Sequence, residues 1–183
     1  MPAGDSATCW DQAPFEDADD PDIAYGFVAA TGSFPQETTC GSCFEVEFDG
    51  TGQYGNDPGS AALTRKRMFV QSTNIGYDVT SNHFDLMVPG GGLGIFDGCT
   101  GSLPGVSALD LGAKYGGFLT TCRGRHGLDH AAVKKCVKDK CSLFEFSPNH
   151  LRRGCEWFVD WFEAADNPNI RYRSVNCPSQ LVA

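Results

Sequence analysis

The sequence predicts a mainly β, disulfide-stabilised fold, in the form of a small closed β-barrel with long loops. Three observations support this prediction. Short segments alternate apolar and polar side chains, turns rich in Gly, Pro, Asp and Asn separate them, and 9 of the 183 residues are Cys. The cysteines are spread from Cys9 to Cys177 instead of gathering in paired ligand clusters, which is typical of disulfides in an oxidising compartment. We therefore expect a secreted, extracellular protein.

The predicted strands follow from the alternation of side chains. Phe44–Phe48 alternates apolar and acidic residues, so we expect its apolar side chains in the core and both Glu45 and Glu47 in solvent. Turn-forming residues make Gly50–Ser60 a loop. Further strands are expected at Arg67–Thr73, His83–Val88, Glu156–Phe162 and Ile170–Val175.

One longer helix is expected. Leu128–Lys140 has a helical composition and a helical spacing of apolar residues. We expect this helix within an insertion at residues 123–150, inside a single domain that spans residues 1–183.

The charge pattern excludes two classes of partner. The chain has 14 basic and 23 acidic side chains, a formal net charge of −9. Nucleic acids and anionic membranes are bound by clustered positive charge, which is absent apart from Arg65–Arg67 and the dispersed Lys134–Lys140. No apolar run approaches the ~20 residues of a membrane span, and the start has neither the basic nor the apolar region of a signal peptide. We expect a neutral polymer or small solute as the ligand, and a signal peptide that is not part of this chain.

Asp85 is the first candidate for catalysis. It lies in mid-strand between Phe84 and Leu86, beside His83 and just before the turn Pro89–Gly92. Burial beside apolar groups raises the pKa of a carboxyl group, as a general acid requires near neutrality. The alternative is that Asp85 alternates outward and is solvated. The glycines of the turn allow the close approach of another backbone or a ligand.

Several longer runs share an order along the chain. They are Met68–Thr73, Ser81–Leu86, Pro89–Cys99, Phe158–Phe162 and Cys177–Ala183, together with Asp78 and Tyr115. In this order they resemble glycoside hydrolase family 45, the fungal-type endoglucanases, over most of the chain. The resemblance implies a six-stranded double-psi β-barrel with an open groove, which hydrolyses internal bonds of a β-1,4-glucan with inversion.

The resemblance also implies roles for single residues. Asp85 takes the place of the general acid, Asp78 that of a loop aspartate which assists over the cleavage point, and Tyr115 that of a tyrosine lining the groove. His83 and Gly91 are expected to bind substrate beside them, with His83 orienting a neighbouring carboxylate. Hydrolysis by two carboxylates needs no cofactor. We therefore expect a monomer with no cofactor.

The catalytic base is the missing part of this scheme. An inverting enzyme needs a second carboxylate, roughly 6.5–9.5 Å from the acid, to activate water. In the family this base lies in a Tyr-Trp-Asp-Cys-Cys motif near the N-terminus, which is not found in this chain. Asp11 is a candidate, although its surroundings match a later family segment. We expect that the chain lacks the family's first segment.

The resemblance implies a disulfide pattern. The expected pairs are Cys43–Cys177, Cys122–Cys155 and, within the insertion, Cys136–Cys141. Cys9, Cys40 and Cys99 are expected to stay unpaired, because their family partners lie in or just after the missing segment. The absence of the family's first segment would then explain both the odd number of cysteines and the absent base.

Other interpretations stay open. A non-hydrolytic, expansin-like protein that binds or loosens cellulose has a similar barrel and lacks the base, so a carboxylate facing Asp85 decides between the two. A zinc site normally needs four ligands from two close pairs, and only one Cys-x-x-Cys pair, Cys40 with Cys43, is present, so no metal is expected. Trp157 and Trp161 share a face of their predicted strand, where core packing is favoured over stacking on sugar rings.

Overall fold

The computed structural model describes residues 12–30, 40–75, 83–95, 97–103, 105–147 and 149–182. The chain forms two compact units. The sheet unit consists of Pro14–Met87 and Asn167–Ala183, and the helical unit consists of Met1–Ala13 and Val88–Asp166. Within the described residues no helix is both long enough and apolar enough to cross a membrane.

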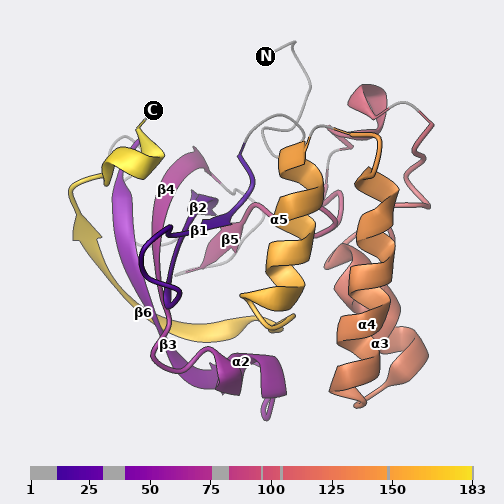
Figure 1. The fold of residues 1–183 in the computed structure, drawn as a ribbon, viewed down its shortest axis with the longest axis horizontal. Coiled ribbons are helices and arrows are strands. Elements are labelled where there is room, and N and C mark those ends of the chain that lie inside the picture. Colours follow the sequence, from indigo (N-terminus) through magenta and orange to yellow (C-terminus); the bar gives the residue numbers. More distant parts are fainter. Residues whose placement is uncertain are drawn as a thin grey trace. The chain divides into compact units, whose positions relative to one another are not determined.

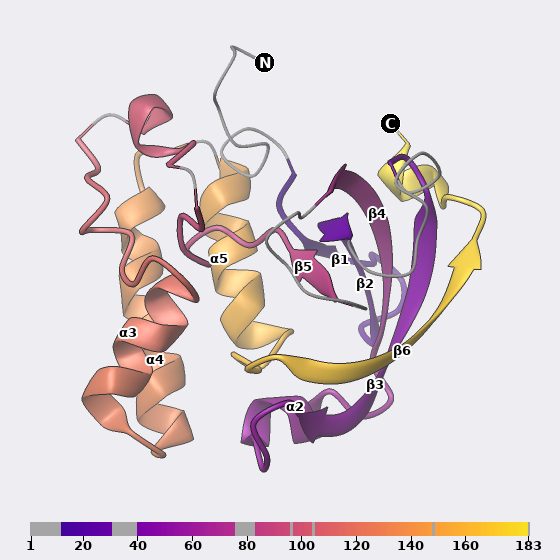
Figure 2. The ribbon, with the colours of Figure 1, turned by 180° about the vertical axis from the view of Figure 1, so that it is seen from behind.

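The described part of the sheet unit contains a six-stranded mixed sheet (Figures 1 and 2). Its order is β1-β2-β4-β3-β6, and β5 also pairs with β2. β2 and β4 are parallel, whereas the other pairs are antiparallel. The strands are β1 (Phe15–Glu16), β2 (Ile23–Ala30), β3 (Cys43–Gly52), β4 (Arg67–Ile75), β5 (Phe84–Leu86) and β6 (Pro168–Val175).

This sheet confirms the predicted β fold. The strands expected at Phe44–Phe48, Arg67–Thr73 and Ile170–Val175 correspond to β3, β4 and β6, and β5 is a shorter form of the strand expected at His83–Val88. The loop expected at Gly50–Ser60 holds the end of β3 and the start of the short helix α2 (Pro58–Ala62). Neither β1 nor β2 is among the predicted strands.

The inner face of the sheet curves around aromatic side chains. The apolar side chains of Phe44, Val46 and Phe48 on β3 are buried, as predicted. The rings of Phe84 on β5 and Tyr172 on β6 have their centroids 5.1 Å apart, although the two strands lie at opposite sides of the sheet order. The sheet therefore bends until its end strands meet through side chains. This curvature is consistent with the predicted double-psi barrel.

The outer face carries a buried carboxylate. Glu45 is 3% exposed and forms ion pairs with Arg67 on β4 and Arg173 on β6. The prediction that Glu45 faces solvent is therefore wrong, while Glu47 is exposed as expected. The strand alternates as predicted, but two guanidinium groups from the neighbouring strands cover the Glu45 side chain in place of water.

Three aromatic rings form a row across the same outer face. Phe15, Tyr25 and Phe69 lie directly opposite one another on β1, β2 and β4, and their rings are stacked. Tyr25 is buried and packs in a cluster with Leu181 of the 3-10 helix η4 (Ser179–Leu181). Its hydroxyl donates a hydrogen bond of 2.6 Å to Asp17 Oδ2. The sheet thus buries apolar side chains on both faces.

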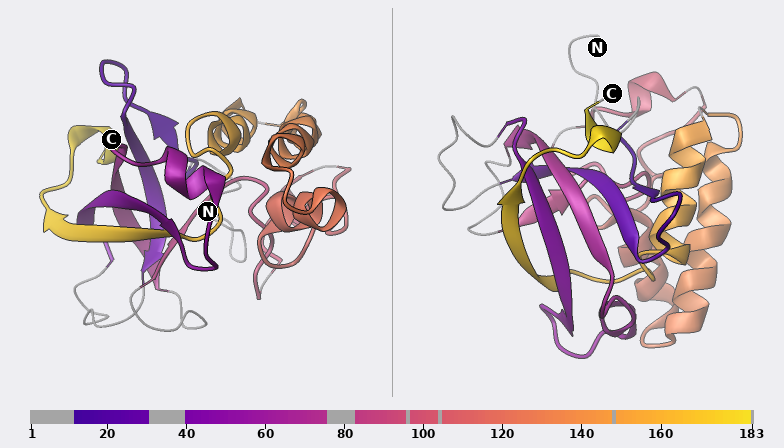
Figure 3. Two further views of the ribbon diagram at one scale, coloured as in Figure 1. Left: turned by 90° about the horizontal axis from the view of Figure 1, so that it is seen from below. Right: turned by 60° about the vertical axis from the view of Figure 1, so that its left-hand side comes forward.

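The described part of the helical unit contains the α-helices α3, α4 and α5, and Figure 3 shows α4 and α5 side by side. The predicted helix Leu128–Lys140 is confirmed as α4 (His130–Lys140). Its N-cap is Asp129, whose side chain accepts a 3.0 Å hydrogen bond from the Ala132 N–H. Large buried side chains such as Phe118 fill the core between the helices. The elements are η2 (Thr100–Ser102), α3 (Gly117–His126), α4 (His130–Lys140), η3 (Cys141–Phe144) and α5 (Asn149–Asp160).

The prediction of a strand at Glu156–Phe162 is wrong, because α5 covers most of this segment. Aromatic and β-branched residues in the segment favour a strand locally. The helical period of buried residues, however, begins at Leu151, before the start of the predicted strand at Glu156. Trp157 and Trp161 lie one helical turn apart, stack with ring centroids 5.2 Å apart, and are buried. Both therefore belong to the core.

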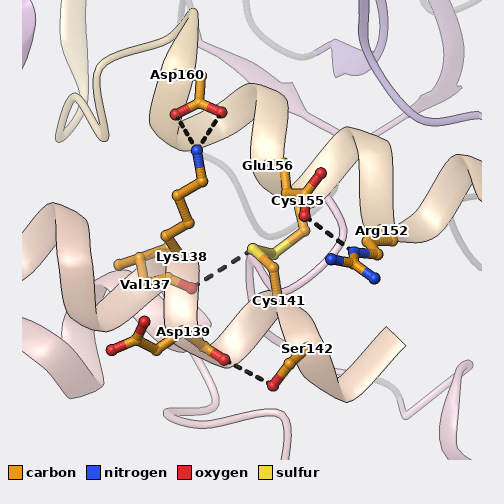
Figure 4. The surroundings of a disulfide bond; sticks show 9 residues. All are labelled: Val137, Lys138, Asp139, Cys141, Ser142, Arg152, Cys155, Glu156 and Asp160. Atoms are coloured by element: carbon orange, nitrogen blue, oxygen red, sulfur yellow. Dashed lines mark hydrogen bonds and ion pairs between the residues drawn. A yellow bond between two sulfur atoms is a disulfide. The ribbon is translucent and has the colours of Figure 1, made fainter. Parts of the chain in front are cut away.

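The disulfides confirm one predicted pair and correct the others. Cys43 is bonded to Cys177, as expected. The pairs predicted as Cys122–Cys155 and Cys136–Cys141 are wrong: Cys122 is bonded to Cys136, which joins α3 to α4, and Cys141 is bonded to Cys155 on α5. The helical course of α5 places Cys155 beside the start of η3, within reach of Cys141 (Figure 4).

The three cysteines expected to be unpaired have different outcomes. Cys40 is an exposed free thiol, as expected. Cys99 is disulfide-bonded, so the expectation that it has no partner in this chain is wrong. Cys9 lies outside the described residues.

Candidate active site

The pairing of β5 with the end of β2 determines the orientation of Asp85. Phe84 and Leu86 lie opposite Ala30 and Val28, and their side chains turn to the inner face, where Phe84 contacts Phe44 with ring centroids 5.0 Å apart. Because side chains alternate along a strand, Asp85 projects from the outer face, opposite Ala29, and it is exposed. Of the two orientations considered from the sequence, the outward one is found. The other orientation, in which Asp85 is buried among apolar groups, is not found.

His83 lies immediately before β5 and is exposed. It stands two residues before Asp85 in the chain. Among the described residues His83 makes no hydrogen bond. The imidazole is thus available beside the carboxylate for a ligand, and its expected role in orienting a carboxylate stays a prediction.

In the helical unit, two loops pack backbone against backbone. The Phe118 N–H donates a 2.9 Å hydrogen bond to the Gly90 carbonyl, and the Gly94 N–H donates one of 3.0 Å to the Lys114 carbonyl. A Cβ atom at Gly117 would overlap the Gly90 carbonyl oxygen. The predicted use of the glycines for the close approach of another backbone is therefore confirmed.

This loop pair presents two of the predicted substrate-binding residues. Gly91 is exposed at the turn, and Tyr115, in the facing loop, is 61% exposed. The Lys114 ammonium lies 5.4 Å from the centroid of the Tyr115 ring. An exposed aromatic ring beside a glycine turn offers a flat apolar surface to an approaching ligand.

Two predicted carboxylates, Asp78 and Asp11, lie outside the described residues.

Comparison with known proteins identifies the family. A model described as glycosyl hydrolase family 45 matches residues 2–183. The chain belongs to this family. The earlier resemblance is thereby confirmed.

Relatives of the chain carry the name endoglucanase. The chain is 45% identical over 183 residues to Endoglucanase B of Cellvibrio japonicus, covering 97% of this chain and 34% of that protein. It is 37% identical over 179 residues to an endoglucanase of Cryptopygus antarcticus, covering 97% of this chain and 64% of the relative. The chain thus spans about one third to two thirds of the length of these relatives.

A solved structure of family 45 agrees with the fold. The crystal structure of a cellulase from the Antarctic springtail Cryptopygus antarcticus matches with a TM-score of 0.67 and 34% identity. The match covers 93% of this chain and 66% of that chain.

A disulfide uses one of the two cysteines that were considered as ligands of a metal site. Cys43, the second residue of the Cys-x-x-Cys pair, is bonded to Cys177. Among the described residues no group of three or more His, Cys, Asp or Glu side chains is arranged to hold a metal ion.

Sequence reasoning missed the strand that supports Asp85. β2 (Ile23–Ala30) is an unbroken apolar run of the length of a buried strand, and this signal could have located it. The pairing of Ala29 with Asp85 could not have been read from the sequence, because β5 is short and pairs across a long chain separation.

Proposed function

We propose that this family 45 chain is a catalytic domain that hydrolyses internal β-1,4-glycosidic bonds of cellulose or a related β-glucan with inversion. The observation that carries the proposal is the match of the family 45 model to residues 2–183. Asp85 on β5 is exposed, so a polymer can reach it. The printed names of its relatives as endoglucanases support the substrate class. We infer that the protein is secreted and acts as a monomer without a cofactor.

In the proposed reaction Asp85 is the general acid and protonates the leaving glycosidic oxygen. A second carboxylate removes a proton from water, which attacks the anomeric carbon from the opposite face of the sugar. His83, Tyr115 and Gly91 would contact the glucan. Asp78 would assist over the cleavage point.

The proposal is tested by release of reducing sugar from carboxymethyl cellulose. General acid catalysis contributes about 10²- to 10⁴-fold, so Asp85→Asn should lower kcat by about that factor. Asp139→Asn is the matched control, because Asp139 is an exposed aspartate of α4 that pairs with Lys135. Equal activity of the wild type and Asp85→Asn would remove Asp85 from the mechanism.

The identity of the base needs a separate experiment. If Asp11 supplies it, Asp11→Asn should lose activity as fully as Asp85→Asn. Azide, a small nucleophile, should then restore turnover of an activated substrate, since the base is needed to deprotonate water. The anomeric configuration of the first product, followed by NMR, tests inversion.

A further inference from the structure

A β-bulge turns Asn74 toward the outer face of the sheet. Along the parallel pair β2 and β4, Val28 lies opposite Ser72, and the next pair is Ala29 opposite Asn74, so that Thr73 is an extra residue. Without it, the alternation of side chains would direct Asn74 to the inner face. Bulges re-aim side chains in this way, and they are rare in parallel pairs.

The bulge completes a row of three side chains. Ala29 lies opposite Asp85 on one side and opposite Asn74 on the other, so all three project from one face. Asp85 and Asn74 are both exposed. Two strand spacings separate β5 from β4, which places the two Cβ atoms roughly 9–10 Å apart. Ala29, which lies between them on β2, has only a methyl group as its side chain.

The amide of Asn74 is held in one orientation. Its Oδ1 accepts a 2.9 Å hydrogen bond from the Ile75 N–H. The hydroxyl of Ser72, which is 0% exposed, donates to the Asn74 carbonyl at 3.3 Å and thereby ties the two ends of the bulge together. Among the described residues, Asn74 Nδ2 donates no hydrogen bond. It is a preorganised donor on the same face as Asp85, one strand removed from it, so little entropy is lost when it binds.

We propose that Asn74 is a substrate-binding residue, whose Nδ2 donates a hydrogen bond to an oxygen of the sugar that lies over Ala29, beside the bond that Asp85 protonates. This inference rests on the proposed function. An amide does not take up a proton near neutral pH, so Asn74 binds and orients the sugar and does not replace the base.

Binding of cellohexaose, measured by calorimetry in an Asp85→Asn background, tests the inference without hydrolysis. Asn74→Ala should raise the dissociation constant about 2- to 10-fold, the range that corresponds to one net hydrogen bond. Asn169→Ala is the matched control: Asn169 is an exposed amide of β6 that donates to Thr51 Oγ1 at 2.8 Å. It should leave the dissociation constant unchanged.

A second variant separates the donor from the bulge. Asn74→Asp keeps the acceptor for the Ile75 N–H but removes the donor, so it should weaken binding at least as much as Asn74→Ala. Binding equal to that of the Asn169→Ala control in both Asn74 variants would overturn the inference. Wild-type protein that binds cellohexaose but releases no sugar would overturn the hydrolase proposal alone, because the comparison of binding constants would still stand.

Discussion

Nη1 of Arg67 lies 3.1 Å from Oε1 of Glu45, a carboxylate whose side chain is 3% exposed. Arg173 pairs with the other oxygen of the same carboxylate. The side chains of Arg67 and Arg173 are 43% and 73% exposed, so water solvates them when an ion pair is broken. The Glu45 carboxylate is buried, so water does not replace a lost arginine in the same way. The cost of disruption therefore depends on which partner is removed.

Removing both arginines should cost more stability than removing Glu45. We expect Glu45→Gln to lower the free energy of unfolding by about 1.5–3 kcal/mol, the value of hydrogen bonds to a charged group. The double variant Arg67→Gln with Arg173→Gln leaves a buried charge unpaired and should lower it by about 3 kcal/mol or more. Urea denaturation of the three proteins measures both values. A double variant as stable as Glu45→Gln would contradict the burial of this charge.

Two glycines of α3 should respond to alanine in opposite directions. Gly117 has a φ of 45°, and a Cβ there would overlap the Gly90 carbonyl and the Gly92 amide. Gly117→Ala should therefore destabilise the protein by about 2–4 kcal/mol. Gly124 has nothing within 4 Å of a built Cβ, so Gly124→Ala should stabilise the helix by about 0.5–1 kcal/mol. Thermal unfolding measures the melting temperatures of the two variants. A change of the same sign in both melting temperatures would contradict the close approach of the loops at Gly117.

The helix-linking disulfides predict a peptide map. Digestion without reduction should release one peptide pair that joins Cys122 to Cys136 and another that joins Cys141 to Cys155. Replacement of both Cys141 and Cys155 by Ala should lower the free energy of unfolding by about 3 kcal/mol, as expected for a short closed loop. A peptide that links Cys122 to Cys155 would contradict the pairing.

Tyr25 should give stability a dependence on alkaline pH. Burial, followed by its hydrogen bond to Asp17, raises the pKa of Tyr25 from 10.0 to about 12. Because the pKa is higher in the folded state, the contribution to stability is complete below pH 10 and is lost as the pH rises through 12. The difference in unfolding free energy between the wild type and Tyr25→Phe should narrow across this interval. Tyr54→Phe is the control, since Tyr54 is 76% exposed, and it should change stability equally little at every pH.

The parts of the fold that depend on local pattern could be predicted from the sequence. β3 and α4 each carry their own periodicity within one short segment. α5 could not be predicted from Glu156–Phe162, because its apolar period starts earlier and its aromatic residues favour strands when considered alone. The expected disulfide pairs rested on the family resemblance, and the structure instead joins Cys122 to Cys136 and Cys141 to Cys155 of α5.

In the candidate site, too, some residues could be predicted from a local sequence pattern and others could not. The glycine run and Asp85 are visible because an unusual residue type interrupts a regular pattern. Asn74 is not, because its orientation depends on one extra residue in β4, and only the pairing with β2 reveals that residue. The burial of Glu45 likewise depends on two arginines contributed by other strands. Each is a long-range relationship that no local pattern contains.

The sheet unit is discontinuous in the chain, and this has a consequence for synthesis. β3 cannot gain its β6 neighbour until the ribosome has passed through Val88–Asp166, which takes several seconds at about 5–20 residues per second. During that time one edge of β3 is open to pairing with other chains. The Cys43–Cys177 bond can form only after β6 has emerged. Until then the Cys43 thiol can react with a thiol that precedes it in the chain, such as that of Cys40.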